Sequence, residues 1–160
     1  MPAATVAQGE STGDDWIAVP REAIRETMAD LKAQGYGSYV FMTCVDHLAT
    51  PLVEPPPERF ELVYQLRNMK TLHEIRVRVY VPEADPRAPS LHDIFGPANW
   101  DERETFDMFG IVFDGHPRLT RILMPEDWVG YPLRRDFPVG GEPVEFSEEH
   151  ESWQTAPPEV

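Results

Sequence analysis

Two runs of alternating apolar and polar residues, joined by a short link, constrain the fold of this chain more than any other feature. The run 59–67 alternates Phe60, Leu62, Tyr64 and Leu66 with Glu61, Val63 and Gln65, and the run 72–81 alternates Ile75, Val77, Val79 and Val81 with Glu74, Arg76, Arg78 and Tyr80. A period of two is typical of half-buried strands, and so short a link joins antiparallel neighbours. The two runs therefore predict a β-hairpin whose apolar face another element has to cover.

Helix signals lie on both sides of this hairpin. Pro20 opens a stretch to residue 34 in which apolar residues recur at helical spacing, and Gly35 follows as a stop. This amphipathic helix is the nearest element able to cover the hairpin. A second helix is predicted from Pro97 to Gly110, again with proline near its start and glycine at its end. The run 39–45, YVFMTCV, is apolar on both alternating faces and predicts a central strand covered on both sides.

These elements predict the α+β class. We expect a single domain with an amphipathic helix packed on a mixed or antiparallel sheet, followed by a helix and an extended C-terminal interaction segment. The 160 residues suit one domain. Residues 1–15 have no periodicity and predict a disordered leader, residues 16–139 form the domain, and residues 140–160, with six glutamates and no lysine or arginine, predict an extended acidic tail.

The net charge argues against some classes of partner. With 28 acidic against 14 basic residues, the formal charge is -14, which repels phosphate backbones, so nucleic acid is not an expected partner. No window approaches the roughly 18 consecutive apolar residues of a membrane span, and the N-terminus lacks a basic patch followed by an apolar core. We therefore expect a cytoplasmic location unless a partner carries the chain elsewhere.

The sequence offers little for a cofactor or a metal. Cys44 is the single cysteine, so an intramolecular disulfide is impossible and an iron–sulfur cluster, which needs about four thiolates, cannot be housed by this chain alone. No two histidines have the spacing that places two imidazoles on one helix face. Gly35-Tyr36-Gly37 precedes a strand instead of following one, which argues against a phosphate-binding loop.

The second predicted helix carries two candidates for acid/base chemistry. Glu102 and Glu104 could act as a carboxylate pair, but residues two apart on a helix point in different directions. A charged helix face with an Arg103–Asp107 ion pair four residues apart is the simpler interpretation. Cys44 lies within an apolar strand, where a buried, inert thiol is the usual case.

The segment 97–138 combines many aromatic residues with arginines. It contains Trp100, Phe106, Phe109, Phe113, Trp128, Tyr131 and Phe137 beside Arg103, Arg118, Arg121, Arg134 and Arg135. Such a composition is typical of protein interfaces. The alternative is that the aromatics fill a local core and the arginines are solvated, and the sequence alone leaves both interpretations open.

This same segment resembles a known signature. Residues 99–138 contain Glu102-Arg103-Glu104, Asp107 with Met108-Phe109, Gly115-His116-Pro117, Ile122-Leu123, Glu126-Asp127-Trp128, Gly130 and Pro132-Leu133-Arg134-Arg135-Asp136. At this spacing the string resembles the thirty-kilodalton subunit, or C subunit, of NADH:quinone oxidoreductase, respiratory complex I. Weaker similarity upstream extends the resemblance over roughly residues 16–146. The family commonly has a basic residue where this chain has Thr120, and often a histidine where it has Tyr131.

The resemblance implies a structural role in a large assembly. It implies a cofactor-free subunit of the peripheral arm, on the cytoplasmic side of the cell membrane, while flavin, iron–sulfur clusters and quinone belong to partner subunits. The expected partners are the quinone-site subunit of the D type and the iron–sulfur subunits, with extended segments that order on assembly. The implied interface residues are Glu102, Arg103, Glu104, Asp107, His116, Arg121, Asp127, Trp128, Arg134, Arg135 and Asp136.

Three functions remain open at this point. The first is this subunit of a proton-pumping enzyme complex, in which the chain itself has no catalytic site. The second is the equivalent subunit of a quinone reductase that takes electrons from ferredoxin or a deazaflavin. The third is a stand-alone hydrolase that uses Glu102, Glu104 or His116. The sequence does not reveal the electron donor, the quinone or the organism.

Overall fold

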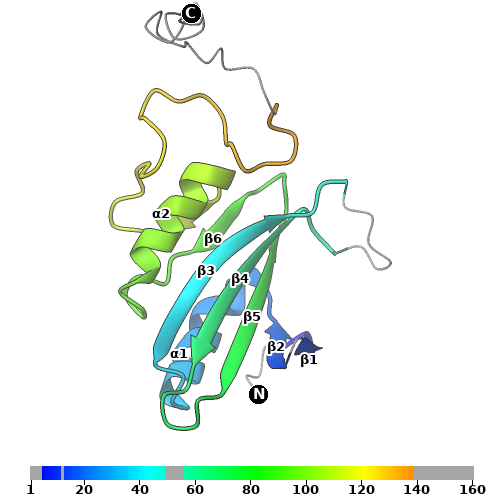
Figure 1. Cartoon of the computed structure of the whole chain (residues 1–160), viewed down its shortest axis with the longest axis vertical. Coiled ribbons are helices and arrows are strands. Elements are labelled where there is room, and N and C mark those ends of the chain that lie inside the picture. The colour runs from blue at the N-terminus through cyan, green and yellow to red at the C-terminus, as the bar shows by residue number, and fades with distance from the viewer. Residues whose placement is uncertain (1–4, 12, 50–55, 139–160) are drawn as a thin grey trace, which may run out of the picture.

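A five-stranded mixed sheet forms the body of the molecule in the computed structural model, which describes residues 5–11, 13–49 and 56–138. The strands are β1 (Ala7–Ser11), β2 (Asp14–Ala18), β3 (Ser38–Asp46), β4 (Phe60–Arg67) and β5 (Glu74–Val81), in the spatial order β1-β2-β5-β4-β3. β2 is parallel to β5, and the other neighbours are antiparallel. Helix α1 (Ile24–Ala33) lies behind the sheet and α2 (Ala98–Phe109) lies beside β3 (Figure 1).

The predicted hairpin and its helical cover are confirmed. β4 pairs with β5 from Phe60↔Val81 to Arg67↔Glu74. The alternate residues of both strands that were expected to face inward are buried. They form one core with Ile24, Met28 and Leu31 of α1, which follows a short 3₁₀ turn, η1 (Arg21–Ala23). The fold class is therefore α+β, as predicted.

The N-terminal residues differ from the prediction of a disordered leader. Residues 7–11 and 14–18 form the antiparallel strands β1 and β2, and β2 continues the sheet beside β5. The sequence of these strands shows no alternation. They are held by backbone pairing of β1 with β2 and of β2 with β5, and by a few buried side chains such as Ile17. Arg78 of β5 also lies over the Trp16 ring at 4.6 Å. Residues 1–4 and the predicted tail at 140–160 lie outside the described residues.

β3 is an edge strand, and the prediction of a central strand is wrong. Its neighbour on one side is β4, and on its other side α2 lies against it. Met42 and Cys44 point into the core, whereas Phe41 and Val45 on the opposite face stay partly exposed. A helix side chain covers the free backbone edge, since Asp101 accepts a hydrogen bond from the Met42 N–H at 2.8 Å. Apolar residues on both faces therefore did not require cover on both faces.

The C-terminal end of α2 sets the direction of the chain that follows the helix. Gly110 ends the helix with φ 74°, a left-handed conformation that glycine adopts at no steric cost. A Cβ atom at Gly110 would lie 2.5 Å from the Tyr131 ring. This glycine therefore allows the residues after the helix to fold back closely over its C-terminal end. Two short parallel strands, β6 (Arg87–Pro89) and β7 (Val112–Asp114), flank this region.

Candidate interaction surface

We call residues 111–138 the C-terminal segment. Three sets of contacts anchor it to the domain, and the first is made by Asp107. This carboxylate is fully buried near the end of α2. Its Oδ2 accepts hydrogen bonds from the backbone N–H groups of Ile122, Leu123 and Met124 at 2.9, 2.7 and 2.9 Å. Burial by itself raises the pKa of Asp107, but these hydrogen bonds and Arg121 outweigh burial and lower the pKa. One side chain of the helix thus shapes a turn about fifteen residues away.

Arg121 extends this anchor along the segment. Its Nη1 donates to Asp107 Oδ1 at 2.6 Å, and its Nη2 donates to the carbonyl oxygens of Trp128 and Gly130 at 3.2 and 3.1 Å. A planar guanidinium with several fixed donors can hold a carboxylate and two carbonyls at once. Asp107 and Arg121 together organise residues 121–130.

A second anchor lies at the C-terminal end of α2, where backbone carbonyls have no partner inside the helix. Leu133 donates its N–H to the Met108 carbonyl at 3.1 Å, and Arg134 Nε donates to the Phe109 carbonyl. The Arg134 guanidinium also lies over the rings of Tyr131 and Phe60 at 4.6 and 5.1 Å. A positive charge at this position is favourable for the helix dipole.

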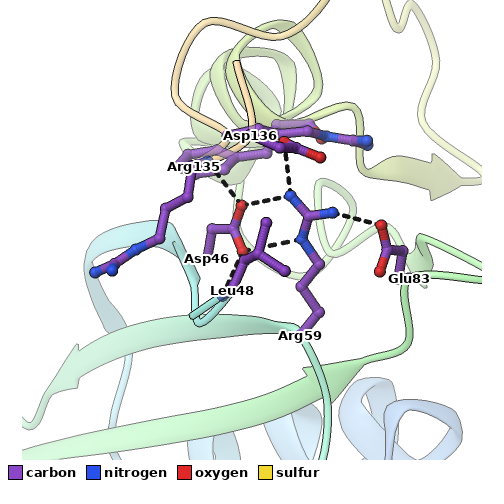
Figure 2. A network of polar contacts seen from close by, with 8 residues as sticks. Asp46, Leu48, Arg59, Glu83, Arg135 and Asp136 are labelled. Carbon is purple, nitrogen blue, oxygen red and sulfur yellow. Dashed lines mark hydrogen bonds and ion pairs between the residues drawn. The ribbon is translucent and has the colours of Figure 1, made fainter. Parts of the chain in front are cut away.

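The third anchor is a charged cluster at the ends of β3 and β4 (Figure 2). Arg59 Nη2 contacts Asp46 and Asp136, both at 2.8 Å, and Nη1 contacts Glu83. Asp46 Oδ2 also accepts the Arg135 backbone N–H at 3.0 Å. The Arg59 and Asp46 side chains are almost fully buried, so this pair is little screened by solvent.

The pKa values in this cluster show how strongly its charges depend on each other. Burial by itself raises the pKa of Asp46, but the hydrogen bonds from Arg59 and from the Arg135 and Leu48 N–H groups outweigh it and lower the pKa to about 2. Hydrogen bonds to Asp46 and Asp136 raise the pKa of Arg59. Asp46 and Arg59 are therefore both charged at neutral pH, and they connect residues 135–136 to the sheet.

Glu102 and Arg103, both predicted as interface residues, make contacts within the chain. Glu102 is fully buried and accepts hydrogen bonds from Ser90 Oγ and from the Leu91 N–H, the latter at 2.7 Å. Burial raises its pKa to about 7. Arg103 donates to the carbonyls of Thr120 and Arg121 at 3.1 and 3.2 Å, so the predicted Arg103–Asp107 pair is wrong and Asp107 pairs with Arg121 instead.

The other predicted residues differ in exposure. His116 is half-buried, and its Nε2 lies 3.1 Å from the Asn99 carbonyl; burial lowers its pKa. Trp128 is half-buried and stacks on Phe137 with ring centroids 6.4 Å apart. Glu104, Asp127, Arg135 and Asp136 are exposed. Asp136 is thus both exposed and part of the third anchor, through its contact with Arg59.

The surface of the anchored segment carries large apolar side chains in solvent. Leu123, Val129 and Leu133 are 59%, 88% and 54% exposed, and Trp100 on the adjoining helix is 60% exposed. We call these four residues the outward apolar set. Arg118 and Arg135 lie in the same segment and make no side-chain contact with a carboxylate or carbonyl among the described residues. Apolar groups flanked by arginines are typical of protein interfaces.

Two of the anchoring residues, Asp46 and Arg59, carry no signal in the sequence. Asp46 ends an apolar strand and Arg59 precedes another, and they meet because β3 and β4 pair from Asp46↔Phe60 onward. Intramolecular hydrogen bonds hold residues 111–138 against the domain. The expectation that extended segments order on assembly stays a prediction. Of the aromatic residues for which the sequence left core and interface open, Phe109 and Phe113 are buried and Trp100 is exposed.

The described part of the chain offers neither a metal site nor a membrane helix. Within residues 5–11, 13–49 and 56–138, no group of three or more His, Cys, Asp or Glu side chains is placed to hold a metal ion. Nor does any helix in these ranges have the length and apolar character to cross a membrane. Cys44 is buried, and burial raises the pKa of its thiol to about 12.

Comparisons with known proteins agree on one family. Residues 17–143 match the model of the respiratory-chain NADH dehydrogenase 30 Kd subunit. The chain is 46% identical over 141 residues to NADH-quinone oxidoreductase subunit 5 of Thermus thermophilus, covering 85% of this chain and 67% of that protein. It is 45% identical over 150 residues to the NADH-quinone oxidoreductase C subunit of Roseiflexus castenholzii, covering 92% and 83%.

Solved structures show the same fold. A trypsin-resistant fragment (1-134) of Nqo5 superposes with a TM-score of 0.66 at 42% identity, covering 71% of this chain and 89% of that one. A chain of the membrane-bound sulfane sulfur reductase, an archaeal respiratory membrane complex, superposes with a TM-score of 0.65 at 25% identity, covering 85% and 79%. Sequence signature, fold and family match together show that this chain belongs to the 30 Kd subunit family of respiratory-chain NADH dehydrogenase, the family of the NADH-quinone oxidoreductase C subunits.

Proposed function

We propose that the chain is a cofactor-free structural subunit of the peripheral arm of a proton-pumping NADH:quinone oxidoreductase. In this role it packs against the D-type quinone-site subunit on the cytoplasmic side of the membrane and near the iron–sulfur subunits. It supports electron transfer from NADH to quinone by holding its neighbours in position and has no catalytic site of its own. The observation that carries the proposal is the outward apolar set on a segment that the domain itself anchors.

The energetic argument starts from the order of the segment. A segment that folds only on binding loses part of its interaction free energy to backbone ordering, about 1 to 2 kcal/mol per residue. Here Asp107, Arg121, Arg134 and Arg59 already fix the backbone. The free energy of burying exposed apolar side chains is then available for association, at about 25 cal/mol per Å² of apolar surface.

Replacing Leu123, Val129 and Leu133 together with serine should reduce incorporation into the complex at least about tenfold, since buried apolar anchors dominate interface free energies. The melting temperature of the free full-length chain should stay nearly unchanged, because all three side chains are exposed. Quantifying the chain in the purified complex measures incorporation. Val6→Ser, which removes one exposed apolar side chain outside this segment, is the control. Normal incorporation of the triple variant contradicts the proposal.

The second candidate is the equivalent subunit of a reductase with another electron donor. The observation in its favour is the similarity to a chain of the membrane-bound sulfane sulfur reductase. Co-purification of the tagged full-length chain with its native partners distinguishes the two, because flavin-containing NADH-oxidising subunits accompany it only in the first case. The hydrolase alternative finds little support, because the Glu102 carboxyl is fully buried against Ser90 and Leu91.

A further inference from the structure

The buried carboxyl of Glu102 faces residues 90–95, which follow β6 and which we call the 90–95 turn. Within the described ranges its hydrogen-bond partners are the Ser90 hydroxyl and the Leu91 N–H. A backbone N–H only donates, whereas a hydroxyl donates one hydrogen bond and accepts others. Ser90 is therefore the partner that can take a proton from Glu102 and pass another one on.

Ser90 also connects Glu102 to the imidazole of His92. Ser90 Oγ lies 3.1 Å from His92 Nδ1 and accepts the His92 N–H at 3.4 Å. The backbone of Ser90 is fixed as well, since its N–H donates to the Asp114 carbonyl at 2.8 Å and its carbonyl accepts from Arg25. Ser90 is buried, whereas His92 is half-buried and reaches solvent. Carboxyl, hydroxyl and imidazole thus form an unbroken line from the interior to the surface.

This line has two complete arrangements of hydrogen atoms. When Glu102 is protonated, its Oε2–H donates to Ser90 Oγ, and the Ser90 hydroxyl donates to His92 Nδ1. When Glu102 is ionised, the Ser90 hydroxyl donates to Glu102 Oε2, and the His92 Nδ1–H donates to Ser90 Oγ. Both arrangements use the same pairs of heavy atoms, so the change from one to the other requires no movement of the backbone.

We propose that Ser90 and His92 form a proton relay between the buried Glu102 carboxyl and solvent. On release, the Glu102 proton moves to Ser90 Oγ while the Ser90 hydroxyl proton moves to His92 Nδ1. His92, now an imidazolium, then loses its Nε2 proton to water. Uptake follows the same steps in reverse, and the net change is one proton. The relay lets Glu102 follow the pH of the solvent in the folded chain, without the local opening that other buried groups need.

His116, the next histidine along the surface, does not extend the relay. Its ring lies 6.0 Å from the His92 ring, measured between centroids. Both of its nitrogens are already occupied, because Nδ1 accepts the Arg118 N–H at 3.0 Å and Nε2 lies 3.1 Å from the Asn99 carbonyl. Burial lowers the pKa of His116, which favours the neutral ring. The proton therefore leaves from His92.

The other charged and titratable groups near Glu102 leave the carboxyl able to gain and lose a proton. Burial raises the pKa of Glu102 to about 7, the hydrogen bonds from the 90–95 turn counteract burial, and the charges of Asp93 and Arg25 have smaller, opposite effects. Asp93 and Arg25 are themselves paired at 2.6 and 2.9 Å. On the sheet, burial first and the Glu102 charge in part raise the pKa of Tyr39 and Tyr64, so both hydroxyls stay protonated.

Infrared spectroscopy of the folded full-length chain after a rapid rise in pH tests the relay. A protonated carboxylic acid has its own C=O stretch, and Glu102→Gln identifies the band of Glu102. His92→Ala should slow the loss of this band at least about tenfold, since a positioned proton-transfer group contributes a factor of this size or more. Imidazole added to the buffer should restore the rate. His73→Ala, which removes a partly exposed imidazole elsewhere, should keep the wild-type rate with or without added imidazole.

Ser90→Ala breaks the line at its centre and leaves His92 in place. It should slow the loss of the band as much as His92→Ala does, and imidazole should not restore its rate. A wild-type rate for His92→Ala, or a slow rate that imidazole does not restore, overturns the relay, and this comparison decides the question if Ser90→Ala fails to fold. A wild-type spectrum without a band that Glu102→Gln removes also overturns it, because Glu102 then holds no proton to pass on.

Discussion

Asp107→Ala should lower the free energy of unfolding by about 3 to 5 kcal/mol, the range expected when one partner of a buried ion pair is removed. The substitution leaves Arg121 without its carboxylate and removes the acceptor of the Ile122, Leu123 and Met124 N–H groups. Each buried donor without a partner costs about 1 to 3 kcal/mol, although water entering the turn reduces this cost. Urea denaturation of the full-length chain measures the change.

The matched control for this variant is on the same helix. Glu104 is exposed, so Glu104→Ala should change the free energy of unfolding by no more than about 0.5 kcal/mol. Both substitutions replace an acidic residue with the best helix former, which isolates the buried contacts of Asp107. If the two variants unfold at the same urea concentration, Asp107 does not anchor the C-terminal segment.

Glu102→Gln should remove a pH dependence of stability that the wild-type chain shows between about pH 5 and 8. Burial raises the pKa of Glu102 to about 7 in the folded chain, above its ordinary value near 4.5. The folded state therefore keeps a proton that the unfolded state releases, so stability is highest below the unfolded pKa and falls as the pH rises through 7. A shift of this size corresponds to about 3 kcal/mol, all of it lost above pH 8.

The difference between the two profiles isolates Glu102, because the two chains share every other ionisable group. Unfolding free energies measured from pH 5 to 8 should decline for the wild type relative to Glu102→Gln. Glu104→Gln, at an exposed carboxylate, should keep the wild-type profile. Parallel profiles for wild type and Glu102→Gln contradict a raised pKa of the buried Glu102 carboxyl.

The parts of the fold that were predictable carry periodic patterns. The hairpin of β4 and β5 and the two helices follow from alternation, helical spacing and the Pro97 and Gly110 boundaries. β1 and β2 were not predictable in this way, because Ala7–Ser11 is polar and small and becomes a strand through backbone pairing. The edge position of β3 was also not predictable. α2 covers the free side of this strand, and no pattern within the strand indicates a contact with a helix.

The candidate surface was predictable only in its location. The aromatic and arginine content of residues 97–138 indicated an interface, and the outward apolar set lies there. The roles of single charged residues could not be predicted from the sequence, because Arg103, Arg121 and Arg134 bind backbone carbonyls within the chain. Hydrogen bonds to main-chain groups depend on how the chain folds back, which residue type and spacing do not specify. Asp46 and Arg59 depend on long-range pairing in the same way.

Hydrogen exchange at the amides of Ile122, Leu123 and Met124 tests most directly whether the domain anchors its C-terminal segment before assembly. These N–H groups bind the buried Asp107 carboxylate, so they should exchange slowly in the free full-length chain. Their protection should change little when the chain is measured in the intact complex. Rapid exchange in the free chain, with protection gained only in the complex, would show that the segment orders on assembly and would contradict this account.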